Sequence, residues 1–186
     1  MASRGSLDRS ETLRLFYGLP VPSEAVPGLA EWTSRTFAGA RGVRPIPPAH
    51  LHVTLAFLGA RPVGELVSLR AALREAATGV DRPVLAPARY RETERVAMIV
   101  FNDESGRAAL LHERLSKRLE QLGSYRPERR TWLPHVTVAR FAKRPRLRPA
   151  LPALAELSPS DAALYHSVLR PDGAQYSILE AVSLGG

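Results

Sequence analysis

Seven stretches of the chain predict β-strands, because apolar residues either run together or alternate with polar ones. The first, LRLFYGL, is an apolar run with an aromatic pair, and Pro20 closes it. The second, HLHVTLAFL, mixes β-branched and apolar residues and ends at Gly59. The last two flank the segment 170–173, whose Arg-Pro-Asp-Gly sequence is typical of a hairpin turn. The predicted strands are 13–19, 50–58, 84–90, 96–102, 135–141, 162–169 and 176–182.

Three stretches carry apolar residues at the spacing of a helix, namely 22–37, 63–77 and 108–122. The last is the clearest, because its leucines recur every three or four residues and Gly123 follows as a stop signal. The first contains Pro27, which disturbs the pattern of its opening turns. Residues 42–48 are rich in proline and predict a loop.

The order of these elements predicts the fold class. Strands and helices interleave, but the connections between strands are too irregular for a doubly wound parallel sheet. We therefore expect a mixed α+β fold with mostly antiparallel pairing. The length of 186 residues fits one domain, which we place at residues 11–186, after a flexible polar N-terminal segment at 1–10.

The composition excludes several classes of protein. A hydrophobic fraction of 45% and a charged fraction of 24% are ordinary for a folded domain and exclude general disorder. Cysteine is absent, which excludes disulfides, cysteine-ligated zinc and a thiol nucleophile. No stretch reaches about 18 uncharged apolar residues, and the polar start lacks the apolar core of a secretory signal. We therefore expect a cytoplasmic protein with no membrane partner.

The charge leaves two interpretations open. The chain carries 26 basic against 18 acidic residues, a formal charge of +8, which favours binding to a polyanion such as nucleic acid. However, Lys117 and Lys143 are the only lysines, so 24 of the 26 basic residues are arginines. Together with 16 prolines, this bias is also typical of a GC-rich genome.

One short motif occurs twice, in two different predicted strands. The first copy reads His-Val-Thr-Leu-Ala-Phe from His52, and the second reads His-Val-Thr-Val-Ala-Arg-Phe from His135. About one such chain in a thousand would contain two His-apolar-Thr-apolar tetrads by chance. Because side chains alternate along a strand, Thr54 shares a face with His52, and Thr137 shares a face with His135. One copy alone would be an ordinary strand end, but the pair indicates a site.

Two imidazoles and two hydroxyls in one cleft suit displacement at phosphorus. A protonated histidine can donate to the leaving oxygen while a neutral one removes a proton from water or an alcohol, and imidazole titrates near neutral pH. The threonine hydroxyls can donate to non-bridging phosphate oxygens. A metal site is less well supported, because neither histidine has an Asp or Glu beside it to complete a set of ligands.

These residues resemble the 2H phosphoesterases, specifically the LigT-like RNA 2′,3′-cyclic phosphodiesterases, which are also called 2′-5′ RNA ligases. The resemblance covers nearly the whole chain, from about residue 13 to 184, and the doubled His-x-Thr-x motif is the family signature. The segments that carry it are Arg14-Leu15-Phe16-Tyr17, residues 51–59, residues 134–140, Leu164-Tyr165-His166-Ser167, Pro171-Asp172-Gly173 and Tyr176.

The resemblance implies a bilobal fold, with two antiparallel sheets related by a pseudo-two-fold axis, helices outside and a central cleft. It implies hydrolysis of RNA 2′,3′-cyclic phosphate ends to a 2′-phosphate, without metal or cofactor, and reversal of the same reaction as 2′-5′ ligation. His52 would be the proton donor, His135 the proton acceptor, and Arg140 the guanidinium that pairs with the phosphate. The implied partner is RNA with such an end, tRNA fragments included, and we expect a monomer.

The chain departs from the family pattern at several positions. His50 stands where an asparagine is usual; we expect an exposed side chain there and leave a proton-transfer role open. Tyr17 stands where phenylalanine is common, and its ring either stacks on a base or packs in the core. Arg130 is only a loose match to a basic stretch before the second motif. We expect His112 to be solvated and His166 to serve packing rather than substrate contact.

Three alternatives remain at this point. The basic loop 143–148 is either simply solvated or holds the RNA backbone. The substrate is either RNA or a small cyclic phosphate, such as a nucleotide or an ADP-ribose derivative. A non-catalytic RNA- or nucleotide-binding module is less well supported, because binding alone does not require both histidines.

Overall fold

The computed structural model describes residues 11–127, 130–171 and 173–185, and the N-terminal segment predicted at 1–10 lies outside them. The strands are β1 (Thr12–Pro20), β2 (Val43–Pro45), β3 (His52–Pro62), β4 (Leu85–Glu92), β5 (Val96–Asp103), β6 (His135–Phe141), β7 (Asp161–Arg170) and β8 (Gly173–Ser183). The helices are α1 (Val26–Thr36), α2 (Leu66–Ala77) and α3 (Arg107–Gln121), with short 3-10 turns η1 (Pro48–His50) and η2 (Val63–Glu65).

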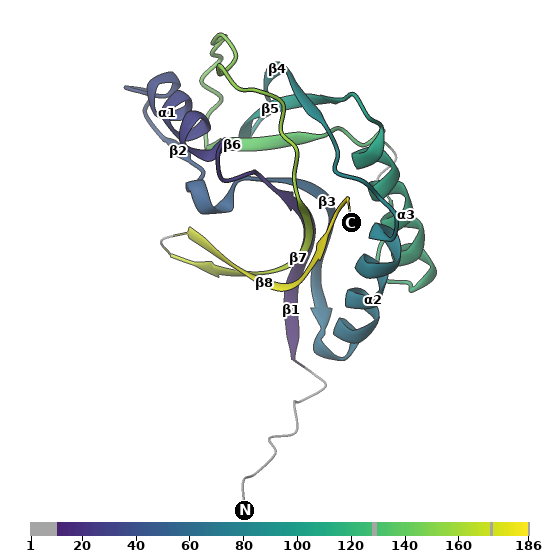
Figure 1. Ribbon diagram of the computed structural model, residues 1–186. Helices are drawn as coiled ribbons and strands as arrows, with labels where there is room; N and C mark the ends of the chain where they lie inside the picture. The colour runs from purple at the N-terminus through teal and green to yellow at the C-terminus, as the bar shows by residue number, and fades with distance from the viewer. Residues whose placement is uncertain (1–10, 128–129, 172, 186) are drawn as a thin grey trace, which may run out of the picture.

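All strands belong to one antiparallel sheet in the order β4-β5-β6-β3-β1-β7-β8, and β2 pairs with β6 beside this path. A single residue pair, Val53 with Val136, joins β3 to β6. The predicted α+β class with antiparallel pairing is therefore confirmed. The two expected sheets are two halves of one continuous sheet, which curls strongly (Figure 1).

Helices α2 and α3 lie side by side on one side of the sheet, and α1 packs at the other end, near η1 and β6 (Figure 1). The helical spacing of α3 is confirmed, because Leu111, Leu115 and Leu119 are fully buried. They join one apolar cluster that runs between the helices and the sheet. No helix within the described ranges is long and apolar enough to span a bilayer.

Two details differ from the pattern-based prediction. The proline-rich loop 42–48 contains strand β2, which pairs Val43 with Phe141 and continues the ladder of β6. Gly59 does not end its strand; β3 runs on to Pro62, because Gly59 adopts a φ of 69° that lets the chain bend without leaving β1. In both places the pairing partner, which lies far away in sequence, decides the structure.

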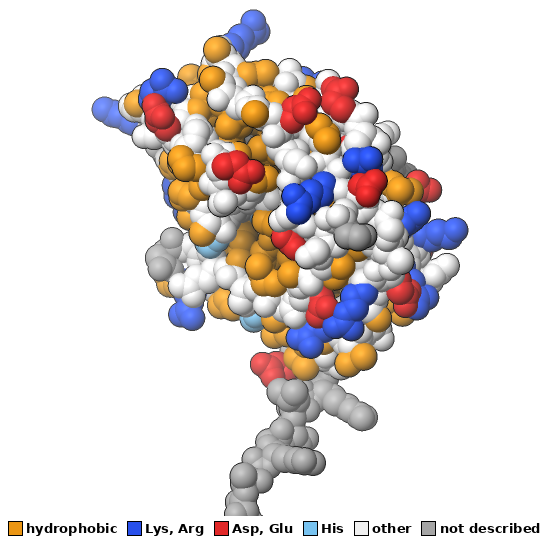
Figure 2. All heavy atoms as spheres, in the orientation of Figure 1, with side chains coloured by type: hydrophobic (Ala, Val, Ile, Leu, Met, Phe, Trp, Pro, Cys, Tyr) orange, Lys and Arg blue, Asp and Glu red, His pale blue; other side chains and the backbone are white. Residues whose placement is uncertain are grey.

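The surface seen in Figure 2 carries acidic and basic side chains interspersed, with no continuous basic patch on that face. Its outline is notched at the left, between the β7–β8 hairpin and the part that carries α1, and a histidine side chain is visible there. The excess of positive charge therefore does not by itself indicate a nucleic-acid surface on this face. The notch lies on the concave side of the sheet (Figure 1).

Candidate active site

The two His-x-Thr-x motifs meet where β3 and β6 pair. The antiparallel pair Val53–Val136 has His52 opposite Thr137 on one side and Thr54 opposite His135 on the other. Both valines are buried in the core, whereas the four motif side chains are partly exposed on the opposite face. The structure therefore brings together the four residues that the sequence predicted as one site.

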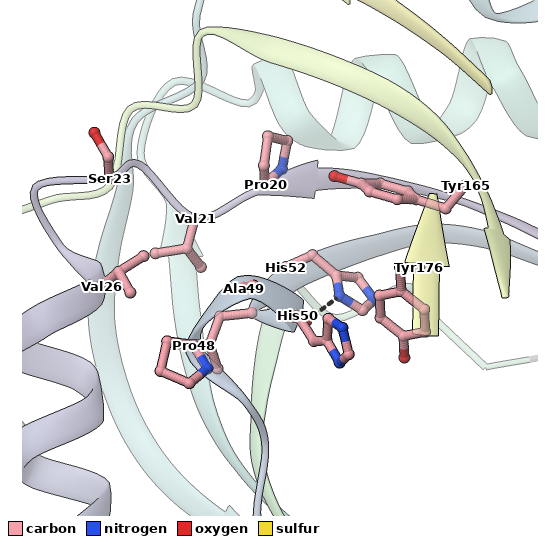
Figure 3. Close-up of a pocket in the computed structure, with 11 residues that line it drawn as sticks. Pro20, Val21, Ser23, Val26, Pro48, Ala49, His50, His52, Tyr165 and Tyr176 are labelled. Atoms are coloured by element: carbon pink, nitrogen blue, oxygen red, sulfur yellow. Dashed lines mark hydrogen bonds between the residues drawn. The ribbon is translucent and has the colours of Figure 1, made fainter. Parts of the chain in front are cut away.

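Both imidazoles are held in the same way. His52 Nδ1 lies 2.7 Å from the carbonyl oxygen of His50, and His135 Nδ1 lies 2.8 Å from the carbonyl oxygen of Leu133. A carbonyl oxygen only accepts, so Nδ1 must carry the proton in each ring. Each Nε2 is then the nitrogen available for proton transfer, a lone pair in the neutral ring and a donor in the cation. Figure 3 shows the contact of His52 with His50.

His52 is neutral at neutral pH in the free protein. Burial lowers its pKa to about 4; the neighbouring imidazoles of His135 and His50 and the guanidinium of Arg140 act in the same direction, while the hydrogen bond to the His50 carbonyl opposes them. An anion bound beside this ring would favour the imidazolium and raise the pKa again.

A matched β-bulge follows each motif. In β3, Leu55 has no partner in β1, although the residues on both sides of it pair with consecutive residues of that strand. In β6, Val138 is the extra residue opposite β5 in the same way. Simple alternation would place Arg140 on the face opposite to Thr137, but the extra residue returns it to the same face. Its effect on the pKa of His52 agrees with this placement.

The first motif carries a ring where the second carries the guanidinium. Phe57 follows the bulge in β3 as Arg140 follows the bulge in β6, and it pairs with Phe16 on the cleft face. Its ring is 49% exposed, and the guanidinium carbon of Arg14 lies 4.7 Å from the ring centroid. The two halves of the cleft thus share their backbone geometry and differ in chemistry.

An aromatic cluster lines the β1–β7–β8 side of the cleft. The ring of Phe16 lies 4.7 Å from His52, is stacked 4.7 Å from Tyr165, and lies 5.0 Å from Tyr176. His50 lies 4.4 Å from Tyr176, so it is part of this cluster and not a fully exposed side chain. These contacts fix the ring of His52 and leave an apolar wall that a planar group can contact.

A cavity of about 290 Å³ opens beside this cluster. It lies between the start of α1, η1 and the tyrosines of β7 and β8, and Figure 3 shows His50, His52, Tyr165 and Tyr176 at one end of it. His52 therefore lies next to a space close to the size that small ligands occupy.

Two side chains outside the motifs support the first bulge. Trp132 Nε1 donates to the carbonyl oxygen of Thr54 at 3.0 Å, and His112 Nδ1 donates to that of Leu55 at 2.8 Å. The two rings stack at 4.9 Å. The prediction that His112 is solvated is therefore wrong, because the helix presents it to a carbonyl that the bulge leaves unpaired. No local pattern in the sequence could have shown this contact.

Several other predicted residues can now be placed. Tyr17 does not reach the cleft: it is fully buried, and its hydroxyl donates to the carbonyl oxygen of Leu69 at 2.9 Å. Alternation in β1 puts Phe16, not Tyr17, on the cleft face, so of the two alternatives for Tyr17 the base contact is wrong and packing in the core is confirmed. His166 pairs with Leu15 on the face away from the cleft, as expected for a packing residue. Arg130 is exposed and lies before β6, and its contact with substrate stays a prediction.

The basic loop 143–148 is anchored by a buried carboxylate. Glu92, whose side chain is 1% exposed, accepts hydrogen bonds from Arg144 Nε at 3.0 Å, from Arg146 N at 2.9 Å and from Leu147 N at 2.8 Å. The loop is therefore a fixed structure rather than a simply solvated one. Whether it holds RNA stays a prediction.

No three His, Cys, Asp or Glu side chains form a group that could hold a metal ion within the ranges that the structure describes. The two motif histidines lie together at the centre of the cleft, and the charge of Arg140 acts on His52.

The chain is similar to proteins of one family along most of its length. The sequence profile of the 2′-5′ RNA ligase superfamily matches residues 21–169. The RNA 2′,3′-cyclic phosphodiesterase of Thermus thermophilus is 34% identical over 184 residues, which cover 94% of this chain and 91% of that protein.

Solved structures agree with the predicted fold. A crystal structure of a Thermus thermophilus protein superposes with a TM-score of 0.81 at 31% identity, covering 94% of this chain and 99% of that one. E. coli LigT, crystallised with 3′-AMP, superposes with a TM-score of 0.80 at 21% identity, covering 95% of this chain and 100% of its own. The LigT-like fold that the sequence predicted is thereby confirmed.

Proposed function

The chain belongs to the 2′-5′ RNA ligase superfamily, and on that premise we propose that it hydrolyses RNA 2′,3′-cyclic phosphate ends to a 2′-phosphate, without a metal ion or cofactor. The observation that carries the proposal is the matched pair of imidazoles. In each ring Nδ1–H donates a hydrogen bond to the backbone carbonyl two residues before it, which leaves both Nε2 atoms for proton transfer on one face. The name of the Thermus relative supports the choice of substrate.

The reaction divides the two proton transfers between the two motifs. Neutral His135 Nε2 takes a proton from water as the water oxygen forms a bond to phosphorus. The bond from phosphorus to the 3′-oxygen breaks, and protonated His52 Nε2 gives its proton to that oxygen. The products are a 2′-phosphate and a 3′-hydroxyl, with His135 protonated and His52 neutral until solvent exchanges the protons. The hydroxyls of Thr54 and Thr137 donate to non-bridging oxygens, and Arg140 balances their charge.

The low pKa of His52 constrains this assignment. A donor must be protonated, yet burial and positive neighbours keep His52 neutral near pH 7 in the free protein. The bound phosphate supplies the missing counter-charge, because an anion beside the ring stabilises the imidazolium. Substrate binding and protonation of His52 are therefore coupled in this proposal.

This coupling predicts a pH dependence. We expect kcat/KM to be bell-shaped, with apparent pKa values that belong to the pair of histidines. In the free protein the His52 ring should stay neutral until the pH approaches about 4, and adding 2′-AMP should raise its pKa. Nitrogen chemical shifts of the imidazoles measure both. A pKa near the ordinary value, unmoved by 2′-AMP, would contradict the coupling between phosphate binding and protonation of His52.

The close packing around His52 predicts the effect of one small substitution. A Cβ added at Gly18 would lie 3.0 Å from the carbonyl oxygen of Val53 and 3.1 Å from His52 Cδ2. We expect Gly18→Ala to displace the ring and lower kcat by roughly 10- to 100-fold. Gly64→Ala is the matched control, because a Cβ there meets nothing within 4 Å. Equal rates for both variants would show that the position of His52 tolerates this shift.

The test of the proposed function is hydrolysis of a short RNA that ends in a 2′,3′-cyclic phosphate, with and without EDTA. Chromatography that separates 2′- from 3′-phosphate ends identifies the product. We expect the 2′-phosphate at an EDTA-independent rate. Inhibition by EDTA would overturn the metal-free mechanism. RNA binding without turnover would indicate a binding module, and turnover of small cyclic phosphates alone would indicate a nucleotide or ADP-ribose derivative as substrate.

A further inference from the structure

Two arginines lie directly opposite each other on the cleft face. Strand β2 pairs with the end of β6 so that Arg44 faces Arg140, between the pairs Val43–Phe141 and Pro45–Ala139. Directly opposed residues of an antiparallel pair project to the same face, with Cβ atoms about 5 Å apart. Since the bulge at Val138 puts Arg140 on the side of Thr137, Arg44 lies there too.

Such a pair is unfavourable unless an anion lies near it, because like charges opposite each other in a sheet repel. Both side chains are exposed, and neither makes an ion pair with any residue that the structure describes. The positive charge at this end of the cleft is therefore not neutralised by an ion pair with any of the described residues. Phosphate oxygens are the natural partners of two neighbouring guanidinium groups.

The two arginines differ in their coupling to the histidine pair. Arg140 follows the second motif on β6 and is among the groups that lower the pKa of His52, and Arg44 is not. Arg140 is therefore placed for the reacting phosphate, and Arg44, on β2, offers a second guanidinium beside it. A cyclic mononucleotide has a single phosphate, which Arg140 alone can bind. An RNA chain carries a second phosphate, in the linkage before its terminal nucleotide, which Arg44 can bind.

We propose that Arg44 binds the phosphodiester that joins the terminal nucleotide to the rest of the RNA, so that the site distinguishes an RNA end from a cyclic mononucleotide. This inference rests on the proposed function. The position of Arg44 is fixed before binding, because Ile46 N donates to the Val138 carbonyl oxygen at 2.8 Å and prolines lie on both sides of Ile46. Because the backbone is already ordered there, only the side chain of Arg44 loses freedom on contact with the phosphate.

The test compares two substrates, 2′,3′-cyclic AMP and the dinucleotide ApA with a 2′,3′-cyclic end, which carries one more adenosine joined through one phosphodiester. We expect Arg44→Ala to lower kcat/KM for the dinucleotide about tenfold and to leave the value for cyclic AMP unchanged. For the dinucleotide, the slope of log kcat/KM against log salt concentration should also become shallower by about 0.7 in Arg44→Ala, because one phosphate contact is lost. Arg44→Lys should recover part of the loss.

Arg114→Ala is the matched control, since it removes the same charge from an exposed position on α3. It should leave both substrates unaffected. An equal loss on both substrates for Arg44→Ala, or no loss on either, would overturn the inference while the proposed function stands. If the unaltered protein turns over neither substrate, the proposed function fails and the inference fails with it. Thermal unfolding of each variant confirms that the fold is retained.

Discussion

Replacing either His52 or His135 with alanine is expected to lower kcat by about 10²- to 10⁴-fold while RNA affinity changes little. Each ring transfers one proton in the reaction. A neutral imidazole carries no charge that would attract the phosphates of the RNA. Because the two act as a unit, the double variant should be only slightly worse than the single ones. Single-turnover rates and binding isotherms with a cyclic-phosphate RNA measure the two effects separately.

Two further variants make the result specific. His52→Asn keeps a donor that can reach the His50 carbonyl but cannot transfer a proton, so it should be as inactive as His52→Ala. His166→Ala removes a histidine on the other face of the sheet and should leave kcat unchanged. Turnover within tenfold of the unaltered protein in both His52→Ala and His135→Ala would refute acid–base catalysis by this pair.

The sequence predicted this pair of histidines because the signal is local. Side chains alternate along a strand, so the sequence of one strand is enough to predict that His52 and Thr54 share a face. The same holds for His135 and Thr137. What brings the two strands together is one long-range pair, Val53–Val136, and only the repetition of the motif indicated that they meet. The resemblance to the family supplied the cleft, which periodicity alone does not show.

The same alternation gives the wrong face for Arg140, because the bulge at Val138 depends on how β6 pairs with β5. Arg44 was missed altogether, since a proline-rich segment is typical of a loop and β2 exists only through its pairing with β6. Tyr17 and His112 show the same limit. Which aromatic ring faces the cleft, and which carbonyl needs a donor, depend on contacts between residues far apart in the sequence.

The two halves of the cleft therefore combine one backbone geometry with different side chains. After the same bulge, the first half presents the ring of Phe57 and the second presents the charge of Arg140. An RNA end also has two unlike parts, a base and a phosphate. The aromatic cluster around Phe16 lies on the half with the ring, and both opposed arginines lie on the half with the charge. We therefore expect the RNA end to bind in one direction, with its base at the aromatic cluster and its phosphates at the arginines.

Replacing Arg140 with alanine is expected to lower kcat by roughly 10²-fold on the cyclic mononucleotide and the dinucleotide alike, because the guanidinium stabilises charge that grows on the reacting phosphate in both. Arg140→Lys keeps the charge but not the two parallel donors, so its rate should lie between those of Arg140→Ala and the unaltered protein. The pKa of His52 in the free protein should rise in Arg140→Ala, since one of the positive charges that lower it is gone. A loss confined to the dinucleotide, with the pKa of His52 unchanged, would instead place Arg140 away from the reacting phosphate.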